Sequence, residues 1–290
     1  MFNLAQVSNH LIVNEDIKRK FSNLAFVDTE IPNSLSFIER REFLGQALGN
    51  ACITGLLVNS NLITSEDVDP RIIQCDYPRF AFVKLHNIYG RNSKKSFDSV
   101  IASTAKISPS AIVAKTNVII EPGVVIEDHC VIGERTTIES DSTVRSGCII
   151  GSTALYIGKG FGGKRISAKH FGAIKIGRGT ELGPNSVIDS GMFAYDVTRV
   201  DCENFIGPLC NISHSVDIGP RNFIAAGVLI SGYTSIGSEN WIGPAVTISH
   251  KIKIGSRNYI SLGSTLLRSI QNDTKVIGSR IFENEFPVRR

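Results

Sequence analysis

The chain has 290 residues, of which 42% are hydrophobic and 20% charged, and its formal net charge at pH 7 is +4. This length is enough for two domains with a sizeable buried core. The charge is mild and the Lys and Arg residues are scattered, so the sequence lacks the basic footprint of a nucleic-acid-binding protein.

No basic start followed by an apolar core opens the chain, and no stretch approaches the ~18 apolar residues that a membrane span needs. The six cysteines form no CxxC pair and no zinc-like spacing. We therefore expect free thiols, no metal site and a cytoplasmic protein.

Residues 1–100 show no regular repeat. Helix-like segments at Ser36–Leu48 and Phe80–Ile88 are mixed with short apolar runs at 51–58 and 71–75. This mixture predicts a small α/β domain, joined to the rest of the chain by a linker at 84–99.

A six-residue repeat dominates the rest of the sequence. From residue 206 to residue 260 an isoleucine stands at every sixth position, and Leu266 continues the series. The next residue is nearly always small or polar, as in Gly207, Ser213 and Gly219. The same register holds through 120–150 and 176–188. Neither a helical period nor a strand alternation produces this spacing, so it indicates a solenoid.

Each repeat predicts one short strand whose aliphatic side chain points inward. Three strands complete a coil, and successive coils stack at the ~4.8 Å spacing of a β-sheet. We expect the small residue because the chain bends sharply there. The pattern predicts a parallel β-helix over residues 101–270, with an inserted loop at 152–173 and a C-terminal tail at 271–290.

Counting along the repeat predicts a column of polar residues at one corner of the coils. His214 and His250 each stand two residues after an isoleucine, with Gly232 at the same phase between them. Asp196 occupies that phase one coil before His214. The two histidines are two coils apart, which is roughly 10 Å along the axis.

This column suits acyl transfer. Neutral imidazole can take the proton that an attacking amine loses near pH 7, so His214 is the candidate base. A glycine lets a backbone N–H approach the oxyanion of the tetrahedral intermediate, which is the role we expect of Gly232. A carboxylate such as Asp196 would fix the tautomer of the imidazole.

Two sets of segments resemble the UDP-3-O-acylglucosamine N-acyltransferases of lipid A synthesis. In the N-terminal region LSFIERREF and CDYPRFAFVKLHNIY are similar to the uridine-binding segments of that family. Phe37 matches the stacking Phe, whereas Arg40 stands where the family has Asn and Phe43 where it has Tyr. The resemblance implies that these three residues bind the base of a nucleotide.

In the repeat, NFIGPLCNISHSVDIG, IDSGMFAYD, VLISGYTSIG and VTISHKIKIG are similar to the catalytic segments of the same family. The resemblance implies that His214 is the general base, that Gly232 serves the oxyanion, and that His250 and Asp189 contact the substrates. Gly207 replaces the acidic residue that the family has seven positions before its base, which leaves Asp196 as the candidate partner of His214.

The family also implies a left-handed helix and a homotrimer. Its Gly-Phe-Gly loop at the break in the repeat helps to wall the site of a neighbouring subunit, so we expect Phe161 to take part there and Lys164 to meet a phosphate. A solvated surface loop is the alternative interpretation.

We therefore predict a mainly β, trimeric acyltransferase that moves an acyl group from a pantetheine thioester, on acyl carrier protein or coenzyme A, to the amino group of a nucleotide-activated amino sugar. The setting is lipid A or surface polysaccharide synthesis, with no cofactor beyond the thioester co-substrate. Three alternatives stay open: a short-chain acyl-CoA-dependent O- or N-acetyltransferase of another sugar nucleotide, a zinc-dependent carbonic anhydrase, and a non-catalytic solenoid that binds sugar nucleotides.

Overall fold

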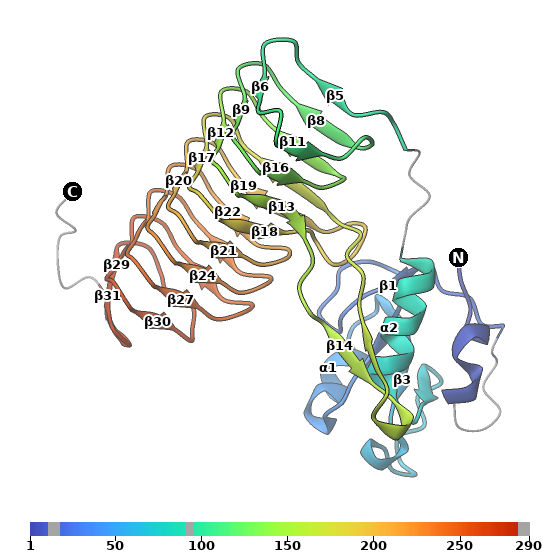
Figure 1. Cartoon of the computed structure of the whole chain (residues 1–290). Coiled ribbons are helices and arrows are strands. Elements are labelled where there is room, and N and C mark those ends of the chain that lie inside the picture. Colours follow the sequence, from blue (N-terminus) through green and yellow to red (C-terminus); the bar gives the residue numbers. More distant parts are fainter. Residues whose placement is uncertain (11–17, 91–95, 284–290) are drawn as a thin grey trace. The chain divides into compact units, whose positions relative to one another are not determined.

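The computed structural model of the chain describes residues 1–10, 18–90 and 96–283 (Figure 1). Two compact units divide the chain, Met1–Ser93 with Leu155–Lys169, and Lys94–Ala154 with His170–Arg290. Residues 91–95 of the predicted linker and 284–290 of the predicted tail lie outside the described residues. The first unit is thus built from two separate stretches of chain.

The first unit contains a four-stranded parallel sheet with the strand order β1-β2-β3-β4. Its elements are β1 (Asn23–Leu24), β2 (Ser34–Phe37), β3 (Ile53–Val58), β4 (Ile72–Gln74), α1 (Leu44–Gly49), α2 (Pro78–Tyr89), and the 3-10 helices η1 (Ala5–His10), η2 (Arg41–Phe43) and η3 (Ser60–Leu62).

The predicted helix at Ser36–Leu48 was wrong in its first part. Its first residues belong to strand β2, which pairs with β1 on one side and β3 on the other. All four residues of β2 are buried. Burial between two strands overrides the local helical pattern, and the α-helix begins only at Leu44.

The interruption of the repeat forms a hairpin that packs on α2. Its elements are β14 (Ile157–Lys159), η4 (Phe161–Gly163) and β15 (Arg165–Ser167). A Cβ at Gly158 would lie 2.9 Å from Cα of Phe80, so only glycine allows this close approach. The Nε2 atom of His86 and the carbonyl oxygen of Lys169 are 2.8 Å apart, which fixes the returning strand to the helix.

The second unit is a parallel β-helix with three sheets (Figure 1). Sheet 1 consists of β7 (Ile112–Val113), β10 (Val131–Ile132), β13 (Ile149–Ser152), β18 (Val187–Asp189), β21 (Asn211–Ile212), β24 (Leu229–Ile230), β27 (Thr247–Ile248) and β30 (Thr265–Leu266). Sheet 2 consists of β5 (Val100–Ile101), β8 (Val118–Ile120), β11 (Thr136–Ile138), β16 (Ala173–Ile176), β19 (Val197–Val200), β22 (Asp217–Ile218), β25 (Ser235–Ile236) and β28 (Lys253–Ile254).

Sheet 3 extends beyond the predicted end of the helix. It consists of β6 (Lys106–Ile107), β9 (Val125–Ile126), β12 (Thr143–Val144), β17 (Glu181–Leu182), β20 (Phe205–Ile206), β23 (Phe223–Ile224), β26 (Trp241–Ile242), β29 (Tyr259–Ile260), β31 (Thr274–Ile277) and β32 (Arg280–Glu283). Strand β31 pairs with β29 in parallel, and β32 closes the stack as an antiparallel hairpin. Residues 274–283, predicted as part of a tail, therefore continue this sheet.

The six-residue repeat builds the core, as predicted. Each aliphatic residue of the series is buried and belongs to one continuous cluster along the helix. Cys130 and Cys148, 18 residues apart, are also fully buried in this core, and all six cysteines are free. Stacked rows of isoleucine remove apolar surface from water in every coil, so each coil stabilises its neighbours.

The reason predicted for the small residue after each aliphatic one was wrong. The left-handed turn comes two residues later, at positions such as Leu209, Ser215 and Tyr233, which have φ values of 58–59°. At Gly183, by contrast, a Cβ would lie 2.5 Å from the backbone of Gly207 in the next coil. Glycine is therefore needed because adjacent coils approach each other closely, and the bend itself tolerates side chains.

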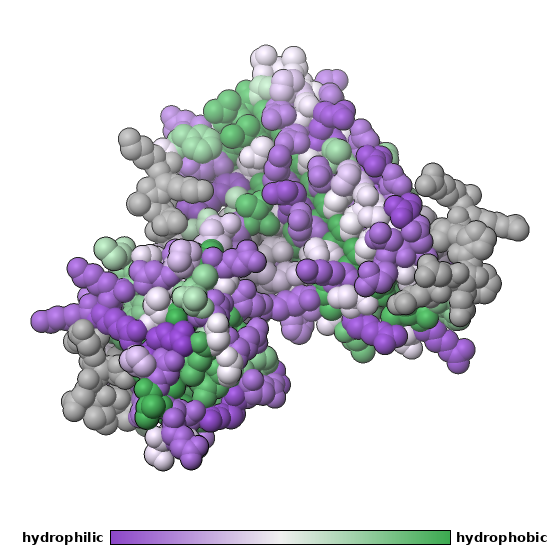
Figure 2. All heavy atoms as spheres, turned by 180° about the vertical axis from the view of Figure 1, so that it is seen from behind, coloured by the Kyte–Doolittle hydropathy of each residue, from purple (hydrophilic) through white to green (hydrophobic). Residues whose placement is uncertain are grey.

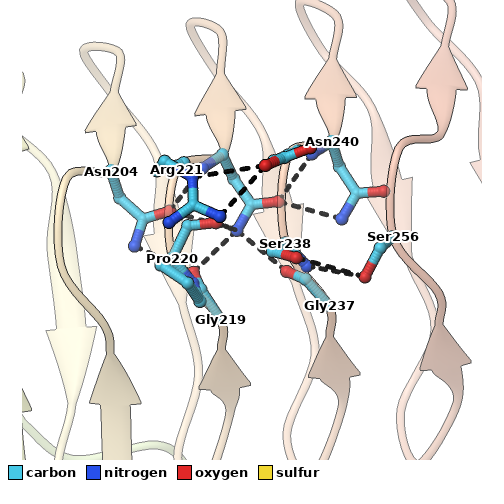
Figure 3. Close-up of polar contacts among 10 residues, drawn as sticks. Asn204, Gly219, Pro220, Arg221, Gly237, Ser238, Asn240 and Ser256 are labelled. Atoms are coloured by element: carbon cyan, nitrogen blue, oxygen red, sulfur yellow. Dashed lines mark hydrogen bonds and ion pairs between the residues drawn. The ribbon is translucent and has the colours of Figure 1, made fainter.

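A ladder of buried asparagines supports one corner of the helix (Figure 3). Asn204, Asn222, Asn240 and Asn258 are at most 2% exposed. The Oδ1 atom of Asn204 accepts the backbone N–H of Asn222 at 2.8 Å, and that of Asn222 accepts the N–H of Asn240 at 2.9 Å. These bonds satisfy backbone groups at the turns, where no strand pairing reaches them.

The outer surface of the coils is not uniformly polar. In Figure 2 hydrophobic residues gather along the stack of coils beside polar and charged ones. Sheet 1 presents a row of exposed aliphatic side chains at its outward positions, namely Ile112, Val131, Ile149 and Leu229.

Candidate functional site

The strand register confirms that His214, Gly232 and His250 stack at one corner. Ile212 pairs with Ile230, and Ile230 pairs with Ile248, so the residue two positions after each isoleucine occupies the same place in successive coils. The backbone N–H of Tyr233 donates to the carbonyl of His214 at 3.1 Å, which continues the stacking through the turn.

Asp196 reaches this column from the far end of an enlarged turn. Ile188 pairs with Ile212, so the coil that contains Asp196 holds 24 residues (212 − 188) between equivalent positions, against 18 for the next coil (230 − 212). Counted from β18, the equivalent of His214 is Ser190. Counted back from β19, where Arg199 pairs with Asp217, it is Asp196. The six extra residues lie in the turn 190–196.

The carboxylate of Asp196 holds Tyr233 and Ser215, and it does not hydrogen-bond to His214. Its Oδ2 atom accepts the hydroxyl groups of Tyr233 and Ser215, each at 2.8 Å, and the backbone N–H of Phe193 at 3.2 Å. Burial, with the Asp196 charge beside it, raises the pKa of Tyr233, so the phenol stays protonated as a donor. The predicted role of Asp196 as the partner of His214 is therefore corrected.

His214 lies between two aromatic side chains. The ring centroid of His170 is 5.4 Å away and that of Tyr233 is 5.1 Å away, and both rings are nearly perpendicular to the His214 ring. Burial, with a smaller contribution from His170, lowers the pKa of His214 to about 4. The imidazole is therefore neutral at pH 7 and has a free lone pair on one nitrogen.

The lack of a side chain at Gly232 leaves room for the His214 imidazole. A Cβ at this position would lie 2.7 Å from both Cε1 and Nε2 of His214. Within the described parts of the chain the N–H of Gly232 donates to no other group. A basic nitrogen and an unused backbone donor thus lie side by side at this corner.

A second histidine, His170, adjoins His214, and a buried carboxylate interacts with it. Asp189 is 5% exposed. Burial raises its pKa, while attraction to His170 and a hydrogen bond from Ser152 act in the opposite direction. The Nδ1 atom of His170 is 2.7 Å from the carbonyl oxygen of Ser190. Sequence reasoning missed His170 because it stands at the end of the interruption, where the repeat gives it no phase.

His250 is exposed at its place in the column. Its neighbour Lys251 places Nζ 5.7 Å from the centroid of the Tyr233 ring. This cation, which sequence reasoning also missed, lies on the same corner as His214. Lys251 is bonded to Gly232 in the preceding coil, because its backbone N–H donates to the carbonyl oxygen of Gly232 at 3.1 Å.

The predicted base-binding residues of the first unit do not form a sandwich. Phe37 is only 9% exposed, and its ring packs against that of Phe82 at 4.8 Å between centroids. The guanidinium of Arg40 lies 4.8 Å from the centroid of Phe43 and pairs with Glu42 at 3.0 Å. Among the described residues no ring contact joins Phe37 to Phe43.

Phe161 and Lys164 lie at the tip of the hairpin β14–β15. Phe161 is 79% exposed and Lys164 is exposed as well. Both belong to the first unit, in which the hairpin is anchored on α2. The glycines of this loop thus serve close packing at Gly158 and leave an aromatic and a cationic side chain at the tip.

Within the described ranges, no group of three or more His, Cys, Asp or Glu residues is arranged to hold a metal ion. Nor does any helix of those ranges have the length and apolar character needed to cross a membrane.

Solved structures share the fold of this chain. The UDP-N-acetylglucosamine acyltransferase from Campylobacter jejuni matches with a TM-score of 0.53 and 24% identity, over 63% of this chain and 71% of that chain. LpxA from Acinetobacter baumannii matches with a TM-score of 0.51 and 22% identity, over 63% of this chain and 72% of that chain. No family model and no curated protein matches the sequence. At these identities the likeness shows the fold.

Proposed function

We propose that this protein is an acyltransferase that moves an acyl group from a pantetheine thioester to the amino group of a nucleotide-activated amino sugar, with His214 as general base. One observation carries the proposal. A neutral imidazole with a lowered pKa lies directly against Gly232, whose backbone N–H is unused. A base and an oxyanion donor are the two groups that acyl transfer to an amine requires.

The chemistry runs as a direct transfer. The amine nitrogen attacks the thioester carbonyl carbon and forms the C–N bond, while Nε2 of His214 takes the proton that the nitrogen loses. The carbonyl oxygen becomes an oxyanion and accepts the N–H of Gly232. The C–S bond then breaks, and the leaving thiolate takes its proton from the His214 imidazolium. The products are an amide and a free thiol, and His214 is neutral again.

Two carboxyl groups and a lysine lie around the His170–His214 pair. The Asp189 carboxylate is buried near His170, and the Asp196 carboxylate binds the Tyr233 hydroxyl beside the His214 ring. Lys251 and His250 continue the corner, and His250 is the proposed contact to the donor or the acyl group.

The partners follow from the same proposal. The donor is acyl carrier protein or coenzyme A. The proposed contacts to the nucleotide of the acceptor belong to the first unit. They are Phe37, Arg40 and Phe43, together with Phe161 and Lys164 on the hairpin. The setting is lipid A or surface polysaccharide synthesis in the cytoplasm, which agrees with six free cysteines. The fold shared with two acyltransferases that the solved structures describe supports the reaction class.

We further propose a homotrimer. The outward row of Ile112, Val131, Ile149 and Leu229 on sheet 1 exposes between 37% and 65% of each side chain. Ile112, Val131 and Ile149 are neighbours on adjacent strands, whereas Leu229 lies three strands beyond Ile149, past Val187 and Asn211. Exposed aliphatic side chains grouped on one sheet are characteristic of a surface that another subunit covers.

The test is a substrate panel. UDP-, dTDP- and GDP-linked amino sugars are incubated with short acyl-CoAs and with 3-hydroxyacyl carrier protein, and thiol release and acylated sugar are followed together by mass spectrometry. The proposal predicts an amide on the sugar nitrogen in at least one combination. An ester on a sugar hydroxyl would contradict the N-acyl assignment, and thiol release without any sugar acceptor would contradict the transfer itself.

A further inference from the structure

The His170–His214 pair contains two buried ring nitrogens. Nε2 of His170 and Nδ1 of His214 are both buried, and neither has a hydrogen-bond partner among the described residues. A buried polar atom without a partner costs free energy. The two rings are neighbours, with their centroids 5.4 Å apart and their planes at 87°.

The spacing fits a direct bond between the two rings. An N–H···N hydrogen bond of about 3.0 Å between imidazoles whose nitrogens face each other separates the ring centroids by about 5.3 Å. The observed 5.4 Å agrees with that separation. Both unpartnered nitrogens would be satisfied at once if the rings turned so that these two nitrogens face each other.

The protons of this pair can be assigned from Ser190. The carbonyl oxygen of Ser190 can only accept a hydrogen bond, so Nδ1 of His170, 2.7 Å away, must carry a proton. In neutral His170 the lone pair is then on Nε2. Nδ1 of His214 must carry the second proton to complete the bond, which leaves the lone pair of His214 on Nε2, next to Gly232.

We propose that His170 is the positioning residue of His214. It accepts the Nδ1–H of His214, holds the tautomer in which Nε2 is the base, and donates its own Nδ1–H to the Ser190 carbonyl. This inference rests on the proposed acyl transfer for its catalytic meaning. It also explains how a site without a carboxylate on His214 orients its base, because Asp196 is committed to Tyr233 and Ser215.

The first test reads the tautomer directly and does not depend on activity. In the full-length protein with ¹⁵N-labelled histidine, NMR at pH 7 reports which ring nitrogen of His214 is protonated. The wild type is expected to carry the proton on Nδ1. In His170→Ala this preference is expected to be lost, and in His170→Gln it is expected to persist, since the Gln oxygen can accept the same N–H. A proton on Nε2 of His214 in the wild type, or an unchanged Nδ1 proton in His170→Ala, would overturn the proposal.

The second test uses the acyl-transfer assay. His170→Ala is expected to lower kcat with little change in KM, His170→Gln to recover part of the loss, and the double variant with His214→Ala to be no slower than His214→Ala alone. Equal losses in both His170 variants, with intact circular dichroism and a normal melting temperature, would overturn the positioning role. If His214→Ala itself were fully active, the proposed function would fail while the tautomer measurement would still decide the pairing.

Discussion

At the residue scale, the His214 ring occupies the space that a side chain at position 232 would fill. A methyl group at position 232 would lie 2.7 Å from Cε1 and Nε2 of the imidazole, well inside contact distance. The oxyanion role assigned to the Gly232 N–H therefore depends on the same missing side chain that lets the base lie there. The chemistry and the packing at this corner cannot be separated.

This close contact makes Gly232→Ala a sharp test of geometry. The new methyl group forces the His214 ring away from its position, and a displacement of about 1 Å is expected to lower kcat/KM about 100-fold. The matched control is Gly45→Ala in helix α1, where an added Cβ meets no atom within 4 Å. Steady-state kinetics of both variants check the prediction, and equal activity of the two would contradict it.

His214 also connects pH to stability. Its pKa is about 4 in the folded protein, against 6.5 for an ordinary histidine, so the unfolded chain takes up a proton at a higher pH than the folded one does. The contribution of His214 to the free energy of unfolding is fully present above pH 6.5. It is lost as the pH falls toward 4, by at most about 3 kcal/mol.

Urea unfolding at pH 4.5, 5.5 and 7 measures this loss. His214→Gln, which cannot titrate, is expected to lose less stability over this range than the wild type does. His129→Gln, a change at an exposed histidine of the same unit, is expected to follow the wild type. An equal pH dependence in the wild type and in His214→Gln would show that the imidazole is not buried as described.

At the element scale, the coils are held together by the asparagine ladder as well as by the aliphatic rows. Figure 3 shows Asn204 and Asn240 within a network of hydrogen bonds that crosses the coils. Asn222 accepts the backbone N–H of Asn240, and its own Nδ2 donates to the carbonyl oxygens of Gly219 and Gly237 at 2.7 and 2.9 Å. One side chain therefore satisfies buried backbone groups in two coils.

Removing one rung is expected to destabilise the helix. Asn222→Ala leaves buried donors and acceptors without partners, at a cost of about 1–3 kcal/mol for each group that water cannot reach. Asn211→Ala, at a partly exposed position of β21, serves as the control. Chemical denaturation of both variants should show a loss for Asn222→Ala only, and a similar stability of the two would contradict a structural role for the ladder.

The repeat could be predicted from the sequence because its signal is local and regular. Ten isoleucines at intervals of six fix the inward positions, and the eighteen-residue coil follows from them. The ladder was missed although Asn204, Asn222, Asn240 and Asn258 repeat at the same eighteen-residue interval. That spacing was a usable signal. The strand at Ser34–Phe37 was hidden, by contrast, because its burial depends on partners β1 and β3, which are distant in sequence.

The candidate site could be predicted only where the repeat is regular. His214, Gly232 and His250 stack as counted, since no residue is inserted between them. Asp196 also lies at the counted phase, because the six extra residues at 190–196 come before it and the offset from β19 to β22 is again eighteen. Its hydrogen bonds to Tyr233 and Ser215 depend on side-chain geometry, which counting could not predict. His170 stands at the end of the hairpin, where the six-residue repeat is interrupted. Counting along the repeat therefore could not predict its contact with His214.

At the scale of the whole molecule, the proposed trimer gives the exposed aliphatic row of sheet 1 a partner. We expect a native mass three times that of the 31.6 kDa chain in analytical ultracentrifugation. Ile149→Lys places a charge in the middle of the row and is expected to shift the mass toward that of the monomer. Thr137→Lys, on β11 of sheet 2, is the control. A wild-type protein that sediments as a monomer would contradict the trimer.

The central claim is that His214 is the base of a thioester-dependent transfer, and one measurement tests it most directly. The rate of thiol release is followed with the donor and amino sugar that the substrate panel identifies, for the wild type, His214→Ala and the exposed-histidine control His129→Ala. The account predicts that kcat/KM falls at least about 100-fold in His214→Ala, the usual effect of removing a general base, and is unchanged in His129→Ala. A folded His214→Ala protein that releases thiol at the wild-type rate would contradict it.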